Sequence, residues 1–378
     1  MIRFKVLLGC GLTAAVLLAA ACGGEDRPDV DVIEDGGNGS GSGSVSASGA
    51  PSGPSTGAAG YTPVSNVDIY FDQTLDLRDL RGVMQPATQG QPVDWAAARA
   101  IYEQGKNAKR GDGTPRPLKT LATDANVLAL FPNAEMVYGN ASFLDTHVSD
   151  ALNGTGAAQG QSDNARRQMV DKGVQAILYG KALQELAAAK TRVEQGNLDN
   201  NTGAPHALDE AWGLIAGRPD ESGNLAYGLL ATATGREDNF NLKGKLRDPL
   251  VASFNEALKA AQAGNATAFN AEYDKIRGRL NTIFYLGALR YAKQLEGDSG
   301  AADRMVHAAE GGSFYLAIRS QVAAASAGAA QTVQSAYTRS PNEAFPASAT
   351  AQVYAALNEV PVLQALAIPA DLVVRSAP

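Results

Sequence analysis

Residues 164–196 read NARRQMVDKGVQAILYGKALQELAAAKTRVEQG and form the longest helical pattern in the chain. Gly196 follows the last periodic residue, as expected where a helix ends. Alanine is abundant and runs of β-branched residues are scarce, so a large sheet is not expected. The pattern predicts an all-α protein built as one or two antiparallel helical bundles. The apolar side chains of the stretch recur at intervals of three and four, which places them on one stripe of a helix: Met169, Val170, Val174, Ile177, Leu178, Ala182, Leu183 and Leu186.

The same spacing predicts helices on both sides of this stretch. The helix that opens near Pro205 has its proline in the first turn and Gly217 at its end, which is the usual asymmetry of helix termini. Residues 67–72 (VDIYFD) predict a short strand or an extended lead-in. The further helices are expected over residues 93–105, 205–217, 249–263, 266–295, 301–308, 314–337 and 347–357.

The N-terminus has the layout of an export signal. Arg3 and Lys5 precede an apolar run that ends at residue 21, too short to cross a bilayer comfortably. Small residues then stand directly before Cys22, as the peptidase that processes lipoproteins requires. We expect a lipoprotein signal peptide over residues 1–21 and a lipid anchor on Cys22. An ordinary signal cut elsewhere is the alternative.

The segment that follows is expected to be a tether. Residues 36–60 are almost entirely Gly, Ser, Ala and Pro, a composition that cannot bury enough apolar surface to order itself. As a flexible coil, residues 22–62 would span roughly 35 Å. Gly23, in place of Asp after the anchor, resembles the sorting pattern for the outer membrane, facing the periplasm or the cell surface. The folded domain is expected over residues 63–378.

Composition excludes several kinds of chemistry. The two cysteines, Cys10 and Cys22, both belong to the signal region, so the predicted domain has no thiol for disulfides, zinc, iron–sulfur clusters or nucleophilic catalysis. Beyond residue 21 there are 30 basic and 39 acidic residues, a balance that argues against nucleic acid as a partner. No nucleophile elbow, P-loop, dinucleotide fingerprint or zinc-protease helix occurs, and we expect no enzyme.

The strongest candidate for a metal site is the start of the helix at Pro205. His206, Asp209 and Glu210 lie three and four positions apart, so both carboxylates come near the imidazole. Imidazole with carboxylate suits iron, manganese or zinc. The simpler interpretation is that acids are favoured in a first helical turn and that a single histidine packs there. The residues alone leave both interpretations open.

Three other places carry acids of interest. Glu103 ends a predicted helix and is either a ligand or a solvated acid. Glu185 lies near the apolar stripe of the long helix, where a boundary position between core and solvent is favoured slightly over an inward one. His307 and Glu310 share a helical face just before the glycines at 311 and 312, where a break in the helix is expected.

Several segments taken in order resemble the low-iron-inducible periplasmic protein family, known from iron-assimilatory proteins of green algae and bacterial relatives. The similarity extends over about residues 67–360. A fainter resemblance is to imelysin-like proteins, which are helical and extracytoplasmic, and it would fit a two-bundle arrangement. The segments are 94–107 (DWAAARAIYEQGKN), 206–212 (HALDEAW), 232–240 (TATGREDNF), 289–292 (LRYA) and 309–314 (AEGGSF).

The resemblance implies a secreted protein that binds iron and assists its acquisition. It would carry the metal site onto His206, Asp209, Glu210 and Glu185, with Glu103 as a further candidate. The family often has His before the long-helix acid, where this chain has Gln184. The partners expected are the metal ion and, through Cys22, the membrane. The alternatives are a scaffold that binds another envelope protein, with Asp209 and Glu210 facing solvent, and a metal-dependent hydrolase.

Overall fold

The computed structural model describes residues 57, 59–220 and 222–376. Cys22, the predicted signal peptide and most of the predicted tether lie outside the described residues. The contacts divide the chain after Gly43, and every described residue belongs to the second unit, residues 44–378.

This unit is all-α, as the sequence predicts. Helices account for nearly all the regular structure of the described residues, which otherwise contain two isolated bridges, Lys109 with Pro115 and Pro219 with Leu225. The helices are α1 (Asp68–Met84), α2 (Trp95–Gln104), α3 (Leu118–Ala122), α4 (Ala125–Leu128), α5 (Ala134–Tyr138), α6 (Phe143–Asn153), α7 (Asp163–Glu194), α8 (Ala204–Ala216), α9 (Leu229–Phe240), α10 (Arg247–Gln262), α11 (Ala266–Gly297), α12 (Ala301–Leu316), α13 (Arg319–Ala325), α14 (Ala327–Tyr337), α15 (Ala347–Leu357) and α16 (Val360–Leu366).

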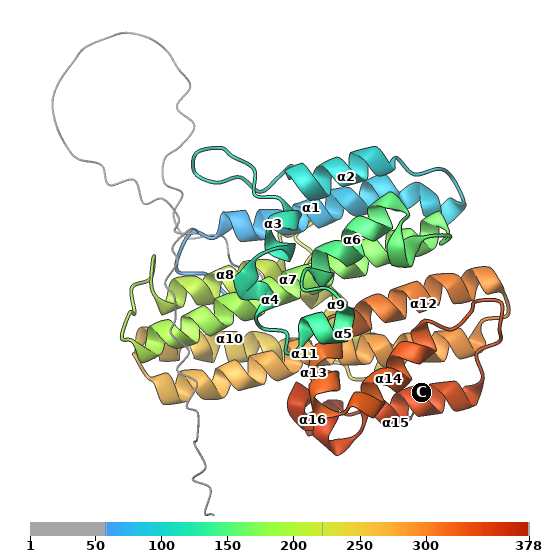
Figure 1. Ribbon diagram of the computed structural model, residues 1–378. Coiled ribbons are helices and arrows are strands. Elements are labelled where there is room, and N and C mark those ends of the chain that lie inside the picture. Colours follow the sequence, from blue (N-terminus) through green and yellow to red (C-terminus); the bar gives the residue numbers. More distant parts are fainter. Residues whose placement is uncertain (1–56, 58, 221, 377–378) are drawn as a thin grey trace, which may run out of the picture. The chain divides into compact units, whose positions relative to one another are not determined.

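Two helices of 32 residues each, α7 and α11, form the centre of the unit and contact one another. On one side α7 packs against α8, α6 and α1, while on the other α11 packs against α10, α12 and α15 (Figure 1). α12 also packs against α7, so the two groups of helices share one continuous core. Within the described residues, no helix is both long enough and apolar enough to cross a membrane.

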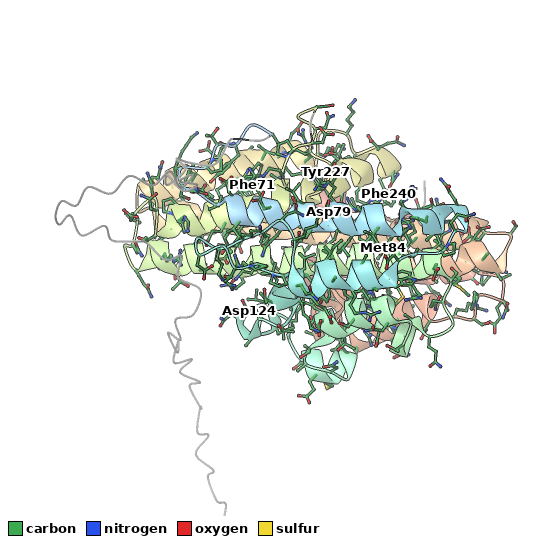
Figure 2. The ribbon with its side chains drawn as sticks, turned by 90° about the horizontal axis from the view of Figure 1, so that it is seen from above. Phe71, Asp79, Met84, Asp124, Tyr227 and Phe240 are labelled. Carbon is green, nitrogen blue, oxygen red and sulfur yellow. The ribbon has the colours of Figure 1, made fainter. Side chains whose placement is uncertain are left out.

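The prediction for residues 67–72 is wrong, because this segment enters α1. Tyr70, Thr74, Leu77 and Met84 are all buried and follow the helical spacing rather than the alternation of a strand. Figure 2 shows Phe71, Asp79 and Met84 distributed along this helix. α1 packs against α7 and α8, and it therefore brings Tyr70 toward the charged residues of those helices.

The predicted break at the glycines of α12 is also wrong, because the helix continues to Leu316. Gly311 is required there by close packing: a Cβ at this position would lie 2.2 Å from Tyr337 Cε1 and 2.7 Å from Tyr291 Cβ. The single helix predicted over residues 314–337 is instead the end of α12 followed by α13 and α14. The predicted helices that end at Gly105 and Gly217 are confirmed, and both glycines have positive φ.

Candidate metal centre

All thirteen residues of α8 are buried, so the charged groups at its start are removed from water. The helix follows Gly203 with Pro205 in its first turn, and it packs against α1, α7 and α10. His206 and Glu210 are each 6% exposed and Asp209 is fully buried. Because a buried charge is costly unless it is paired, the partners of these groups define what the helix start does.

Asp209 fastens the segment before α1 to α8. Its carboxylate accepts hydrogen bonds from the Tyr61 hydroxyl at 2.6 Å and from the Val64 amide at 2.8 Å. It also accepts from the Ser65 amide and the Ser65 hydroxyl, at 2.9 and 2.8 Å. Burial raises the pKa of Asp209 to about 6 in spite of these donors.

The Ser65 hydroxyl also fixes the imidazole of His206. Ser65 Oγ lies 2.9 Å from His206 Nδ1 and gives its own proton to Asp209, so Nδ1 carries the hydrogen that Ser65 accepts. On the opposite side of the ring, Nε2 lies 3.2 Å from Glu210 Oε1. Burial lowers the pKa of His206, but Glu210 raises it more, and the net shift is upward. Nε2 is thus the atom that the Asp209–Ser65–His206 chain directs at the carboxylates.

Glu210 meets Glu185 across the α7–α8 contact. Each carboxyl group shifts the pKa of the other, and the Tyr70 hydroxyl donates to Glu185 Oε1 at 3.3 Å. Burial and the charge of Glu210 raise the pKa of Glu185 to about 7. Burial also acts to raise the pKa of Glu210, but His206, Glu185 and Tyr70 hold it below its usual range. Glu185 therefore retains its proton below about pH 7.

Lys181 supplies the positive charge of the cluster. Its Nζ lies 2.9 Å from Glu185 Oε1, 2.6 Å from Gln184 Oε1 and 3.4 Å from Asp124 Oδ2. Figure 2 shows Asp124, which caps the short helix α4. We refer to Asp124, Lys181, Glu185, His206, Asp209 and Glu210 as the acidic cluster, since four carboxyl groups in it face one ammonium and one imidazole.

The structure thus brings together four of the five residues predicted as metal ligands. Glu185 is 4% exposed, so the boundary position favoured for it is wrong. Glu103 lies apart from the acidic cluster: its carboxylate pairs with Lys119 at 2.9 Å and is about one-third exposed. His307 pairs with Asp298 at 2.8 Å, while Glu310 contacts Lys172.

Sequence reasoning missed Tyr61, Ser65, Tyr70, Asp124 and Lys181. Tyr70 was hidden by the strand prediction, although the spacing of Tyr70, Thr74 and Leu77 is a helical signal. Lys181 could have been found from its position four residues before Glu185 on the same helix face. Ser65 and Tyr61 precede α1, and no local pattern connects them to a residue 144 or more positions away.

A cavity of about 560 Å³ lies elsewhere, among α6, α7, α12 and α14. Its lining includes His147, whose Nε2 lies 2.9 Å from Ser313 Oγ. Burial lowers the pKa of this imidazole to about 4. His147 is therefore neutral and separate from the acidic cluster.

Among the residues that the structure describes, no three His, Cys, Asp or Glu side chains are arranged as a ready-made metal site. In the acidic cluster, Lys181 and the proton that Glu185 holds below about pH 7 occupy the interactions that a cation would make. Cation binding there requires loss of a proton and a shift of the ammonium.

The fold and this cluster define the class: an all-α protein that buries a group of carboxylates with one oriented imidazole between two of its helices. The chain belongs to the family described as low iron-inducible periplasmic protein, which matches residues 40–337. Comparisons with curated proteins and with solved structures find no significant match.

Proposed function

We propose that this protein binds iron at the acidic cluster and assists its acquisition outside the cytoplasm. The observation that carries the proposal is the oriented imidazole of His206, whose buried Nε2 lies 3.2 Å from Glu210 Oε1. Metal-binding histidines usually donate their second ring nitrogen to a polar partner that orients the ring, and Ser65 has that role here.

The donor set suits iron. Glu185 and Glu210 provide hard oxygen ligands, Tyr70 a phenol oxygen, and His206 a borderline nitrogen. Asp209 has an orienting role in this proposal, because its carboxylate faces Tyr61, Val64 and Ser65. The family's name, which refers to low iron and to the periplasm, supports both the ion and the compartment.

The protein acts as a carrier rather than an enzyme. The scaffold alternative expected Asp209 and Glu210 to face solvent, whereas they are 0% and 6% exposed. Iron is the cargo, taken up when the Glu185–Glu210 pair loses its proton. A reversible site is expected, because Lys181 restores the charge balance when the ion leaves.

Isothermal titration of ferrous iron into the protein under argon tests the site. His206→Ala should lose at least tenfold in affinity, and His307→Ala is the matched control because that imidazole pairs with Asp298 outside the cluster. Equal binding by wild type and His206→Ala would remove the site. Circular dichroism establishes that both variants are folded.

We further propose that Cys22 carries the lipid that holds the protein at the outer membrane. Two or more acyl chains give stable anchoring, whereas one binds only marginally. Cys22→Ser should move the protein from the membrane fraction to the soluble envelope fraction and abolish incorporation of labelled fatty acid. Retention of both label and membrane attachment would place the anchor elsewhere.

A further inference from the structure

A second group of charged residues lies among α7, α9, α11 and α12. Cations outnumber carboxylates in it, whereas carboxyl groups outnumber cations in the acidic cluster. Lys172 on α7 contacts Asp171 at 3.1 Å and Glu310 at 3.4 Å. Asp171 also pairs with Arg81 of α1 at 2.8 Å. Both carboxylates are buried, with 7% and 8% of their side chains exposed, and each already pairs with a nearby cation.

Two arginines complete this group. Arg236 and Arg290 each place their guanidinium carbon 5.8 Å from the centre of the Tyr291 ring. Arg236 is also 5.2 Å from the Phe314 ring, and Lys172 approaches the same ring at 5.6 Å. The stacked Tyr291 and Phe314 rings thus hold three cations close to one another.

Neither arginine forms an ion pair with a carboxylate in the part of the chain that the structure describes. Nε and Nη1 of Arg236 and Nε of Arg290 are buried without a hydrogen-bond partner there. Burial and the charge of Glu310 raise the pKa of the Tyr291 hydroxyl, and the charge of Arg236 lowers it. Guanidinium stays charged at every physiological pH, so these N–H groups retain an unmet demand for an acceptor.

The neighbouring acidic residues have other partners than the N–H groups of Arg236 and Arg290. Glu237, next to Arg236, accepts from the backbone amides of Leu246 and Arg247. Asp298 pairs with His307, whose ring lies 5.9 Å from Tyr291. The group thus contains two carboxylates, Asp171 and Glu310, and four cations: Arg81, Lys172, Arg236 and Arg290.

The two charged groups contain the same four residue types: an arginine, a tyrosine, a glutamate and a lysine. Beside the acidic cluster, Arg116 lies 4.5 Å from the centre of the Tyr70 ring, the Tyr70 hydroxyl donates to Glu185, and Glu185 pairs with Lys181. In the second group, Arg236 lies 5.8 Å from the centre of the Tyr291 ring, and Glu310 pairs with Lys172. The acidic cluster contains three further carboxyl groups and an imidazole, whereas the group around Lys172 contains a further arginine, Arg290.

We propose that Arg236, Arg290 and Lys172 form a binding site for a small inorganic oxyanion of the phosphate or sulfate type. Guanidinium groups bind such oxygens through their fork of N–H donors, and an ammonium adds a point charge. The aromatic rings hold the guanidinium groups in place before the anion arrives. The oxyanion accepts hydrogen bonds from the unpartnered nitrogens and balances the excess positive charge.

The test is titration calorimetry of the full chain, purified in chloride, with sodium phosphate and with sodium sulfate at constant ionic strength. Wild type should show saturable binding of at least one of the two. Arg236→Gln and Arg290→Gln should each weaken it at least tenfold. Arg247→Gln is the control, because Arg247 lies on α10 and pairs with Asp248 at 3.1 Å.

Thermal unfolding with the same salts separates a site from a general salt effect. Kosmotropic stabilisation rises without saturation and is the same in wild type and in Arg236→Gln, whereas a bound anion gives a saturable shift that the variant loses. Should the variants fail to fold, a crystal of the wild type soaked in selenate should show anomalous density beside Arg236 and Arg290. Absence of that density, or binding of carboxylates such as acetate without phosphate or sulfate, would overturn the proposal.

Discussion

Lys181 forms an ion pair with Glu185 one helical turn further along α7, with Nζ 2.9 Å from Oε1 and only 2% of the lysine side chain exposed. An ammonium group so placed makes the interactions that a metal cation would make with the same carboxylate. The acidic cluster thus contains its own competitor for iron, which favours reversible binding.

Replacing this competitor should strengthen cation binding. Lys181→Met keeps most of the side-chain volume and removes a charge whose repulsion of a nearby cation is at most about 4 kcal/mol at ~4 Å in partly polar surroundings. We expect ferrous iron to bind at least tenfold more tightly to Lys181→Met at pH 8, measured by calorimetry. Lys190→Met, on the same helix beside Tyr273, should leave the affinity unchanged. Weaker binding by Lys181→Met would show that the lysine supports the site.

Iron affinity should rise with pH up to about pH 7. The pKa of Glu185 is raised to about 7 by burial and by Glu210, so below that pH the metal must displace a proton. The pKa of His206 is raised as well, so the imidazole must also lose a proton. Each pH unit below 7 should weaken binding by up to about a hundredfold, and calorimetry in buffers of different ionisation enthalpy should report about two protons released per iron at pH 6. Glu185→Gln should bind iron weakly at every pH. Proton release near zero at pH 6 would argue against Glu185 as a ligand.

The stability of the metal-free protein should show the opposite trend. Glu185 and Asp209 have raised pKa values in the folded state, about 7 and about 6 against 4.5 and 3.8. Between those limits the folded protein binds more protons than the unfolded chain, so its free energy of unfolding falls as pH rises. Glu185 alone accounts for about 3 kcal/mol at most. Urea unfolding from pH 4.5 to 8 should show this decline, and Glu185→Gln should flatten it; curves that stay parallel would refute the assignment.

The glycine pair in α12 offers a test of the fold itself. A Cβ at Gly311 would lie 2.2 Å from Tyr337 Cε1, whereas at Gly312 the nearest atom is Tyr337 Cβ at an ordinary 3.5 Å. We expect Gly311→Ala to lower the free energy of unfolding by about 1–3 kcal/mol through overpacking. Gly312→Ala should be neutral or stabilising by up to about 1 kcal/mol, because alanine favours the helix. Equal melting temperatures for the two variants would mean that α12 does not pass Tyr337 so closely.

The sequence was most informative where periodicity is long and least informative where function depends on distant segments. The stripe from Met169 to Leu186 predicts α7, because a helix of 32 residues repeats its signal many times. Residues 67–72 have mixed helix and strand propensity. Packing of α1 against α7 and α8 favours the helix there. The spacing of His206 and Glu210 was readable on one helix, whereas the contact of Glu185 with Glu210 depends on how α7 and α8 pack.

Ser65 provides the sharpest test of how the cluster orients its imidazole. Its hydroxyl lies 2.9 Å from His206 Nδ1 and 2.8 Å from Asp209, so Ser65→Ala removes the link between them while leaving every proposed ligand in place. Loss of an orienting partner typically weakens metal binding by 10–100-fold, and we expect that loss for iron. Ser313→Ala is the matched control, because it removes the hydroxyl 2.9 Å from His147 Nε2 outside the cluster. The pKa of His206, followed by NMR, should also change in Ser65→Ala and not in Ser313→Ala. If iron affinity and the His206 titration both remain unchanged in Ser65→Ala, the Asp209–Ser65–His206 chain only fastens the segment before α1 to α8.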